Sequence, residues 1–222
     1  MLLRAIGVTK SYERRGERFF AANGVDLCVG SGDFVCITGR SGSGKSTLLN
    51  MLTGLLRADS GEIIFDGVDL CSLGDARLAK LRCGRIGYVP QGNSLLQNFS
   101  VLDNVRLPLC LARKGGAETK KTARELLSKV GISHLEGEFP RSLSGGEARR
   151  AAIARSLAAD PALLVADEPT GDLDPASADA VMRLFSQASA RGAAVIVVTH
   201  DRQIPPGANR CLVMSGGRLE DL

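Results

Sequence analysis

The feature that most constrains this chain is the stretch GRSGSGKST, residues 39–47, which fits the phosphate-binding pattern G-x-x-x-x-G-K-[ST]. It follows the apolar run FVCIT and precedes a segment with helical spacing from Ser46 to about Leu55. Glycines let such a loop wrap its N–H groups around phosphate oxygens, while Lys45 supplies a cation and the Ser46 hydroxyl suits Mg²⁺. The residues expected at this phosphate site are Gly39, Arg40, Ser41, Gly42, Ser43, Gly44, Lys45, Ser46 and Thr47. The sequence therefore predicts a strand, a phosphate-binding loop and a helix in that order, with an ordinary Gly/Ser-rich loop as the alternative.

Further apolar runs alternate with helical patterns along the chain. Short β-like runs occupy residues 4–12, 24–29, 33–38 and 62–70, and later ones occupy 85–90, 162–166 and 193–199. Apolar residues recur at helical spacing from Val101 to Val130, a helix is expected to begin at Pro175, and residues 211–220 resemble a hairpin. Buried strands that alternate with helices indicate an α/β fold with a parallel sheet covered on both faces. The helical stretch at about 92–158 is expected to form an inserted lobe.

Composition argues against several classes of protein. The 222 residues carry a formal net charge of +4 and only 4% aromatic residues, so we expect no nucleic-acid partner. No apolar run approaches the roughly 18–20 residues of a membrane span. Arg4 interrupts the apolar start, unlike a secretory signal. The six cysteines include no C-x-x-C pair, so we expect reduced thiols in a cytoplasmic protein, with a metal site as the alternative.

A second group of polar residues follows apolar strands. Asp167 and Glu168 end the run ALLVADE, so they are expected at the carboxyl edge of the sheet, where open α/β folds bind ligands. Asp167 is suited to hold Mg²⁺ through water, and Glu168 to orient and deprotonate an attacking water, with a helix cap or a solvent-facing pair as the alternative. His200 ends VIVVTH at the same edge and would reach a γ-phosphate, whereas His134 lies in a polar segment and is expected to be inert. Gln91 ends RIGYVPQ, where its side-chain carbonyl would complete the Mg²⁺ shell.

A second phosphate-binding feature lies much later in the chain. In LSGGEARRAAIARSL, residues 143–157, Ser144, Gly145 and Gly146 lead directly into a helix. Such a start leaves backbone N–H groups bare, which is how proteins hold phosphate. The chain thus carries two phosphate cradles, and the second follows the helical lobe, too far away to fold over the first.

These motifs occur in the order, and at about the spacing, of the ATPase subunits of ABC transporters, which the chain resembles over essentially its whole length. The patterns ADEPTGDLD (166–174) and DNVRLPL (103–109) further resemble the branch that contains lipoprotein-release and macrolide-export ATPases and a cell-division relative. The resemblance implies a single ABC-type ATP-binding domain over residues 1–222. A P-loop NTPase (RecA-like) core and an N-terminal antiparallel β-subdomain would occupy about 1–91 and 159–222, and an inserted α-helical subdomain about 92–158.

The resemblance also implies an Mg²⁺-dependent ATP hydrolase that forms a homodimer on ATP binding. Tyr12 would stack on adenine, and each ATP would lie between the phosphate loop of one chain and the LSGG segment of the other. The residues implied to act on the ATP of the partner chain are Ser144, Gly145, Gly146 and Asp174. Leu173 and Asp174 are implied to belong to a loop that crosses the dimer seam. The chain departs from the commonest family pattern at Glu147, where glutamine is frequent, at residues 148–150 (ARR), and at the two prolines of IPPGANR (204–210).

By resemblance, the chain would be a peripheral subunit at the cytoplasmic face of the cell membrane that powers export or extraction through a separate permease. Substrate specificity would lie in that partner. Leu95, Leu96 and Phe99 are hypothesised to line a groove for a short permease helix, with ordinary packing as the alternative. A second hypothesis is the same ATPase acting as a transmembrane switch for envelope or cell-wall enzymes, without transport. A small-molecule kinase would have no reason to carry LSGG, and a DNA-repair ATPase would need a long coiled-coil insertion.

Overall fold

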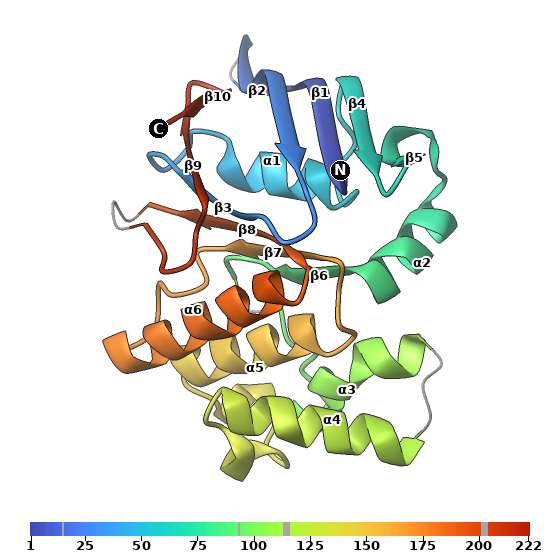
Figure 1. Cartoon of the computed structure of the whole chain (residues 1–222), viewed down its shortest axis with the longest axis vertical. Helices are drawn as coiled ribbons and strands as arrows, with labels where there is room; N and C mark the ends of the chain where they lie inside the picture. The colour runs from blue at the N-terminus through green and yellow to red at the C-terminus, as the bar shows by residue number, and fades with distance from the viewer. Residues whose placement is uncertain (15, 93, 113–115, 201–203) are drawn as a thin grey trace.

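A computed structural model describes residues 1–14, 16–92, 94–112, 116–200 and 204–222 of the chain. Its strands form two sheets, and Figure 1 shows the smaller one stacked above the larger one with helix α1 (Lys45–Leu52) between them. The smaller sheet has the strand order β2-β1-β4-β5, and the larger has the order β10-β9-β3-β8-β7-β6.

Every pair in the smaller sheet is antiparallel. Its strands are β1 (Leu3–Arg14), β2 (Glu17–Val29), β4 (Ser60–Phe65) and β5 (Val68–Asp69). In the larger sheet, neighbouring strands pair in parallel except for β10, which joins the edge antiparallel to β9. Its strands are β3 (Phe34–Thr38), β6 (Ile86–Val89), β7 (Leu163–Asp167), β8 (Ala194–Thr199), β9 (Arg210–Ser215) and β10 (Arg218–Asp221). The expected C-terminal hairpin is therefore the β9–β10 pair.

Besides α1, the described residues form five further helices. They are α2 (Asp75–Arg85), α3 (Val101–Leu111), α4 (Gly116–Lys129), α5 (Gly145–Leu157) and α6 (Pro175–Ala190) among the residues that the structure describes. Short 3-10 helices cover Leu70–Ser72, Ser133–Leu135 and Pro140–Ser142. The helical periodicity predicted over residues 101–130 corresponds to two helices, α3 and α4. In Figure 1, α3 and α4 lie together at the end of the molecule farthest from the antiparallel sheet.

The larger sheet is covered on both faces, as its continuous apolar strands predict. Ile196 of β8 belongs to the same buried core as Leu49 of α1 and the strands of the antiparallel sheet. Its neighbours Val195 and Val197 belong instead to a second core, together with Ile153 of α5 and residues of α6. Alternate side chains thus serve opposite faces. The structure adds that one face is covered by α1 together with a second sheet, rather than by helices alone.

Two elements differ from the sequence interpretation where they are exposed. Helix α2 was not predicted, and Leu78 is the one residue that it buries, so it has little apolar periodicity to detect. Strand β2 begins at Glu17, well before the run 24–29 that was recognised, and its first four residues are exposed. Helix α2 and the first four residues of β2 escape detection because they lack a buried stripe.

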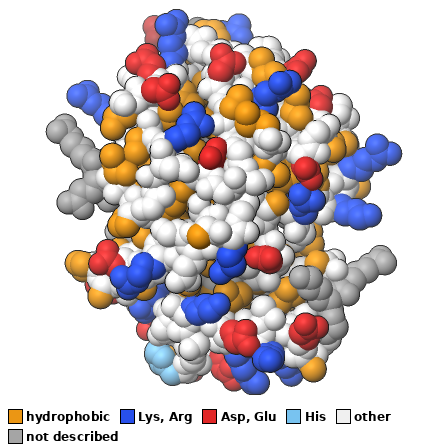
Figure 2. All heavy atoms as spheres, viewed as in Figure 1, with side chains coloured by type: hydrophobic (Ala, Val, Ile, Leu, Met, Phe, Trp, Pro, Cys, Tyr) orange, Lys and Arg blue, Asp and Glu red, His pale blue; other side chains and the backbone are white. Residues whose placement is uncertain are grey.

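The surface of the described residues carries charges of both signs, which are interspersed on the face that Figure 2 shows. No helix among them is long and apolar enough to cross a membrane. All the cysteines are free thiols, and burial raises the pKa of Cys36 to about 12.

Candidate functional site

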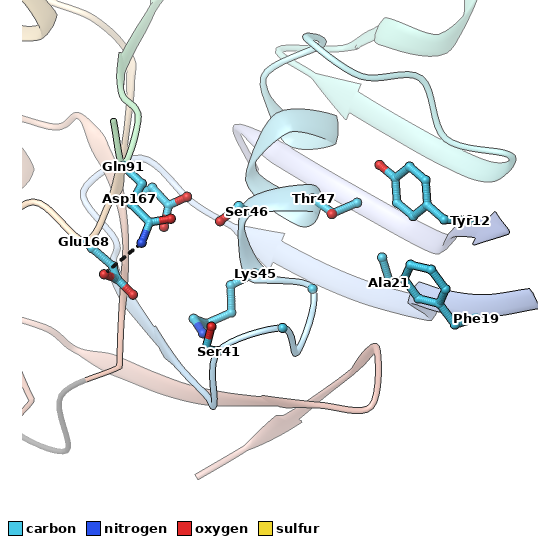
Figure 3. A pocket seen from close by; sticks show the side chains of 12 residues that line it. Tyr12, Phe19, Ala21, Ser41, Lys45, Ser46, Thr47, Gln91, Asp167 and Glu168 are labelled. Atoms are coloured by element: carbon cyan, nitrogen blue, oxygen red, sulfur yellow. Dashed lines mark hydrogen bonds between the residues drawn. The ribbon is translucent and has the colours of Figure 1, made fainter. Parts of the chain in front are cut away.

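A cavity of about 450 Å³ lies where the carboxyl ends of β6 and β7 approach α1 and the first two strands (Figure 3). This is the edge of a parallel sheet at which α/β folds bind ligands. Its lining residues are Tyr12, Phe19, Ala21, Ser41, Gly42, Gly44, Lys45, Ser46, Thr47, Gln91, Asp167 and Glu168. The cavity therefore gathers residues predicted from three distant motifs. Gly39, Arg40 and Ser43, also predicted, line a neighbouring cavity along the same loop.

The phosphate loop (residues 39–47) is shaped by close backbone contacts. Gly44 has φ +104°, and a Cβ atom there would lie 1.8 Å from the carbonyl oxygen of Ala21, so the position requires glycine. The Lys45 ammonium donates hydrogen bonds to the carbonyl oxygens of Gly39 at 2.8 Å and Arg40 at 2.9 Å. Desolvation lowers the pKa of the buried Lys45, while Glu168 and Asp167 act in the opposite direction. The backbone carbonyls of the loop thus hold the Lys45 ammonium in place.

Asp167, the last residue of β7, presents a buried carboxylate to this cavity and is only 3% exposed. Desolvation raises its pKa, and the neighbouring charge of Glu168 adds to the effect. A hydrogen bond from Ser46 and the charges of Lys45 and Arg149 act in the opposite direction. The anion is therefore held in a site that favours a positive partner.

Glu168 is fixed by contacts on both of its carboxylate oxygens. Gln91 Nε2 donates to Glu168 Oε2 at 3.2 Å, as Figure 3 shows, and His200 Nδ1 lies 2.9 Å from Oε1. The backbone N–H of Glu168 donates to Val198 of β8 at 2.8 Å. Its φ of +49° is a left-handed conformation, which is costly for a residue with a Cβ and is typical of functional sites. The structure thus joins Gln91, Glu168 and His200, as their places at three strand ends predicted.

Ser46, Gln91 and Asp167 fit a magnesium ion by the chemistry of their donor atoms. Each offers oxygen, the ligand that Mg²⁺ prefers, and all three line the same cavity. A divalent cation would also stabilise the desolvated carboxylate of Asp167.

An aromatic pair forms the far wall of the cavity. Tyr12 of β1 and Phe19 of β2 stack with ring centroids 5.7 Å apart and an interplanar angle of 28°. Tyr12 is 38% exposed and Phe19 is 46% exposed, so both rings retain free surface. Sequence reasoning missed Phe19, although two adjacent phenylalanines directly after the charged run ERRGER (13–18) are a detectable sign of an exposed aromatic surface.

The start of α5 does not line this cavity. Ser144 and Gly145 border a separate cavity of about 210 Å³ with Gln91 and Asp172. Contrary to the sequence expectation, the N–H groups here are not all bare, because Ser144 and Glu147 form a capping box. The Ser144 N–H and hydroxyl both donate to Glu147 Oε2 at 2.8 Å, and the Glu147 N–H donates to Ser144 Oγ at 3.3 Å. The hydrogen bond from the Ser144 N–H lowers the pKa of Glu147.

Two residues near this segment have structural roles of their own. Gly146 lies close to the loop after β7, since a Cβ there would be 3.1 Å from the carbonyl oxygen of Asp172. Asp174 caps α6 by accepting a hydrogen bond from the Ser177 N–H at 3.0 Å, and the hydrogen bonds from Ser177 lower its pKa. Neither residue lines the 450 Å³ cavity.

Residues 22–171 match the family model described as ABC transporter. Two solved structures of MJ0796, described as a bacterial ABC transporter cassette, are similar to the whole chain. A dimeric post-hydrolysis state bound to ADP and Pi is 35% identical, with a TM-score of 0.94 and coverage of 100% of this chain and 99% of that one. Another dimeric structure is 36% identical, with the same TM-score of 0.94 and the same coverage of 100% and 99%. These similarities confirm the predicted α/β, P-loop NTPase fold with its N-terminal antiparallel sheet.

Proposed function

The chain belongs to the ABC transporter family as an ATP-hydrolysing cassette, and we propose that it powers export or extraction of a substrate through a separate membrane permease. The observation that carries the proposal is the cavity in which Tyr12, Lys45 and Glu168 meet from three parts of the fold. An ATP molecule needs a surface for its base, a cation for its phosphates and a carboxylate that activates water. The cavity offers all three.

For nucleotide binding, we propose that adenine stacks on Tyr12, with Phe19 enlarging the aromatic surface. The phosphates then lie in the loop, where N–H groups and the Lys45 ammonium neutralise their charge. The residues proposed to bind nucleotide are Tyr12, Gly39, Arg40, Ser41, Gly42, Ser43, Gly44, Lys45, Ser46, Thr47 and Gln91.

For hydrolysis, the proposed catalytic residues are Glu168, His200 and Lys45. Glu168 accepts the proton of the attacking water, and its contacts with Gln91 and His200 hold the carboxylate in place to do so. His200 orients Glu168 and reaches toward the γ-phosphate. Magnesium, held by Ser46, Gln91 and, through water, Asp167, would neutralise charge on the phosphates.

We propose that the complete site forms between two chains. Ser144, Gly145, Gly146 and Asp174 do not line the ATP cavity of their own chain, so they would act on the ATP of a partner. The dimeric structures of MJ0796 support a homodimer, and we infer that it closes when ATP binds. In such a dimer, ATP is held from two sides, and its hydrolysis weakens the interface.

The permease would dock in a groove of about 310 Å³ between α2 and α3, which includes Cys83, Leu107, Pro108 and Leu111. Leu111 is 62% exposed and would give a short helix of the partner an apolar contact. Among the three residues that the sequence suggested for this groove, Leu95 is buried in the core. Leu96 and Phe99 are each 42% exposed and could still contact a permease helix. Docking here would hold the chain at the cytoplasmic face of the membrane as a peripheral subunit. We also propose that the chain belongs to the branch of lipoprotein-release and macrolide-export ATPases.

The proposal has a biochemical test and a test of partnership. Lys45→Ala is expected to abolish Mg-ATP binding or hydrolysis because the loop loses its cation, whereas Lys129→Ala, an exposed lysine on α4, keeps the wild-type rate. Wild-type protein is expected to co-purify from detergent-solubilised membranes with a multispan protein, and Leu111→Asp to lose it. Normal turnover by Lys45→Ala would contradict the ATP site. A partner that moves no substrate and instead controls an envelope enzyme would favour the signalling alternative.

A further inference from the structure

Arg149 of α5 is a buried charge that is held against the loop after β6. Its side chain is only 6% exposed. Nη1 donates to the carbonyl oxygen of Pro90 at 2.6 Å, and Nη2 donates to the carbonyl oxygen of Gln91. A buried guanidinium is tolerated only where acceptors surround it, so these two carbonyls and Arg149 fix one another's positions.

The same guanidinium faces a second loop. Nη2 lies 3.6 Å from Asp172 Oδ2, in the segment between β7 and α6. Nearby, the first turn of α5 packs closely on this segment at Gly146. Arg149 therefore stands where three parts of the chain meet: the loop after β6, the start of α5 and the loop after β7.

A short path connects Arg149 to the reacting groups. The backbone that it grips carries the Gln91 side chain, whose amide donates to Glu168 at 3.2 Å. Since the position of a side chain follows that of its own backbone, a displacement at the Gln91 carbonyl moves the amide away from Glu168. Arg149 itself does not line the ATP cavity.

We propose that Arg149 is a positioning residue for ATP hydrolysis. It sets the place of Gln91, and through Gln91 that of Glu168, while tying both to the start of α5. This inference rests on the proposed roles of Gln91 and Glu168. It makes the geometry of water activation depend on the seating of α5, the helix whose first residues are proposed to contact the partner's ATP.

Arg155, on the same helix, provides a matched control. It is also buried, and burial lowers its pKa. Its Nη1 donates to the Ser94 carbonyl oxygen and its Nη2 to Ser94 Oγ, both at 2.7 Å. Arg155 thus holds the same loop further along, and its two hydrogen bonds go to Ser94 rather than to Gln91 or Asp172.

The test is a double-mutant cycle between Arg149→Met and Gln91→Ala in the full-length protein, read by kcat and KM for ATP. Arg149→Met is expected to lower kcat on the order of 10-fold or more with KM within about 3-fold, because misplaced groups slow chemistry more than binding. In the Gln91→Ala background, the same change is expected to alter kcat by less than about 2-fold, because the residue acts through Gln91. Arg155→Met combined with Gln91→Ala is expected to be additive.

A second measurement, made without nucleotide, accompanies the double-mutant cycle. In the free protein, amide hydrogen exchange of the peptide that spans residues 87–98 is expected to be faster in Arg149→Met than in wild type. Thermal unfolding is recorded for every variant, and the cycle is repeated with Arg149→Lys, which keeps the charge and a donor, so that a folding defect of Arg149→Met does not decide the outcome. Arg149→Lys is expected to recover part of kcat.

Additive losses in the Arg149–Gln91 cycle, or a wild-type kcat in Arg149→Met, would overturn the inference. The failure of the proposed function has a different signature, since Lys45→Ala and Glu168→Gln would then hydrolyse ATP normally. If those two variants are inactive while the Arg149 cycle is additive, only the positioning role is wrong.

Discussion

At the scale of single residues, two groups of the site adopt energetically unfavourable states. Glu168 adopts a left-handed φ of +49°, and Asp167 is a carboxylate at 3% exposure. Neither feature stabilises a fold by itself, because a strained backbone and a desolvated charge both cost free energy. Both residues lie at the end of a parallel strand and face the phosphate loop. A charged ligand in this cavity would explain why they are placed there. Substitutions of Glu168 and Asp167 separate the proposed role in hydrolysis from the free-energy cost to folding.

Glu168→Gln tests the proposed base. The amide keeps the shape of the side chain and removes its ability to accept a proton, so ATP is expected to bind while hydrolysis falls at least ~10²-fold. Because the nucleotide persists, the variant is expected to elute as a dimer with Mg-ATP and as a monomer without it, by size-exclusion chromatography. Glu125→Gln, an exposed carboxylate on α4, serves as the control. A variant that stays monomeric at high protein and ATP concentrations would count against dimerisation driven by ATP.

Asp167→Asn tests the cost of the buried charge. Desolvation raises the pKa of Asp167, so the folded state binds a proton more readily than the unfolded state. This acid therefore opposes folding once the pH rises above its unfolded pKa, and the penalty is fully present above the folded pKa. We expect Asp167→Asn to unfold at an equal or higher temperature than wild type at neutral pH, with the difference shrinking as the pH falls, while Mg²⁺-dependent turnover is lost. A clearly lower unfolding temperature at neutral pH, or normal turnover, would contradict this account.

At the scale of elements, helices and strands are predicted best from the sequence where burial of one face makes apolar residues recur at a regular spacing. The run FVCIT with GRSGSGKST identifies β3 and α1, and the apolar runs before Glu168 and His200 identify β7 and β8, so the end of each strand locates a site residue. Where an element is mostly exposed, as α2 is, no period marks it. Phe19 was missed because its partner Tyr12 lies across a strand pair, and cross-strand neighbours depend on register rather than on sequence distance.

The capping box at the start of α5 was also missed, although Ser144-x-x-Glu147 is its local sequence signature, and it has a consequence for dimer formation. The Glu147 carboxylate accepts hydrogen bonds from the Ser144 N–H and hydroxyl, groups that are proposed to receive the partner's phosphate. A negative charge at a helix N-terminus competes with a second anion there.

Glu147→Gln is therefore expected to favour the closed dimer. Glutamine keeps the capping box but removes the charge, so in the Glu168→Gln background the ATP concentration for half-maximal dimer is expected to fall about 2- to 5-fold. Sedimentation or size exclusion across an ATP titration measures it. Glu138→Gln is the control, because Glu138 bonds the nearby Ser142 hydroxyl at 2.9 Å without capping α5. A higher ATP requirement in Glu147→Gln would show that the carboxylate assists closure instead.

At the scale of the whole molecule, the two segments that the sequence predicts to hold phosphate lie on different parts of one chain. The phosphate loop follows β3 and opens into the cavity with Tyr12 and Glu168, whereas Ser144 borders another cavity beside Asp172. A transition state for phosphoryl transfer gains from positive dipoles on more than one side. A pair of chains packed head to tail would bring the two cradles onto one phosphate, which explains why a small protein carries both. We therefore propose that each ATP is shared between two chains.

Mixing two inactive variants tests that claim most directly. Lys45→Ala lacks the phosphate cation but keeps its LSGG segment, while Ser144→Arg keeps the phosphate loop but places a bulky side chain in the partner's phosphate seat. Each homodimer has two defective sites, whereas a mixed dimer with shared sites has one doubly defective site and one intact site. We expect the mixture to regain Mg²⁺-dependent ATPase activity, measured in a preparation in which crosslinking demonstrates mixed dimers. If both cradles instead served one ATP within a single chain, every site would stay defective, and a mixture without activity would contradict the account.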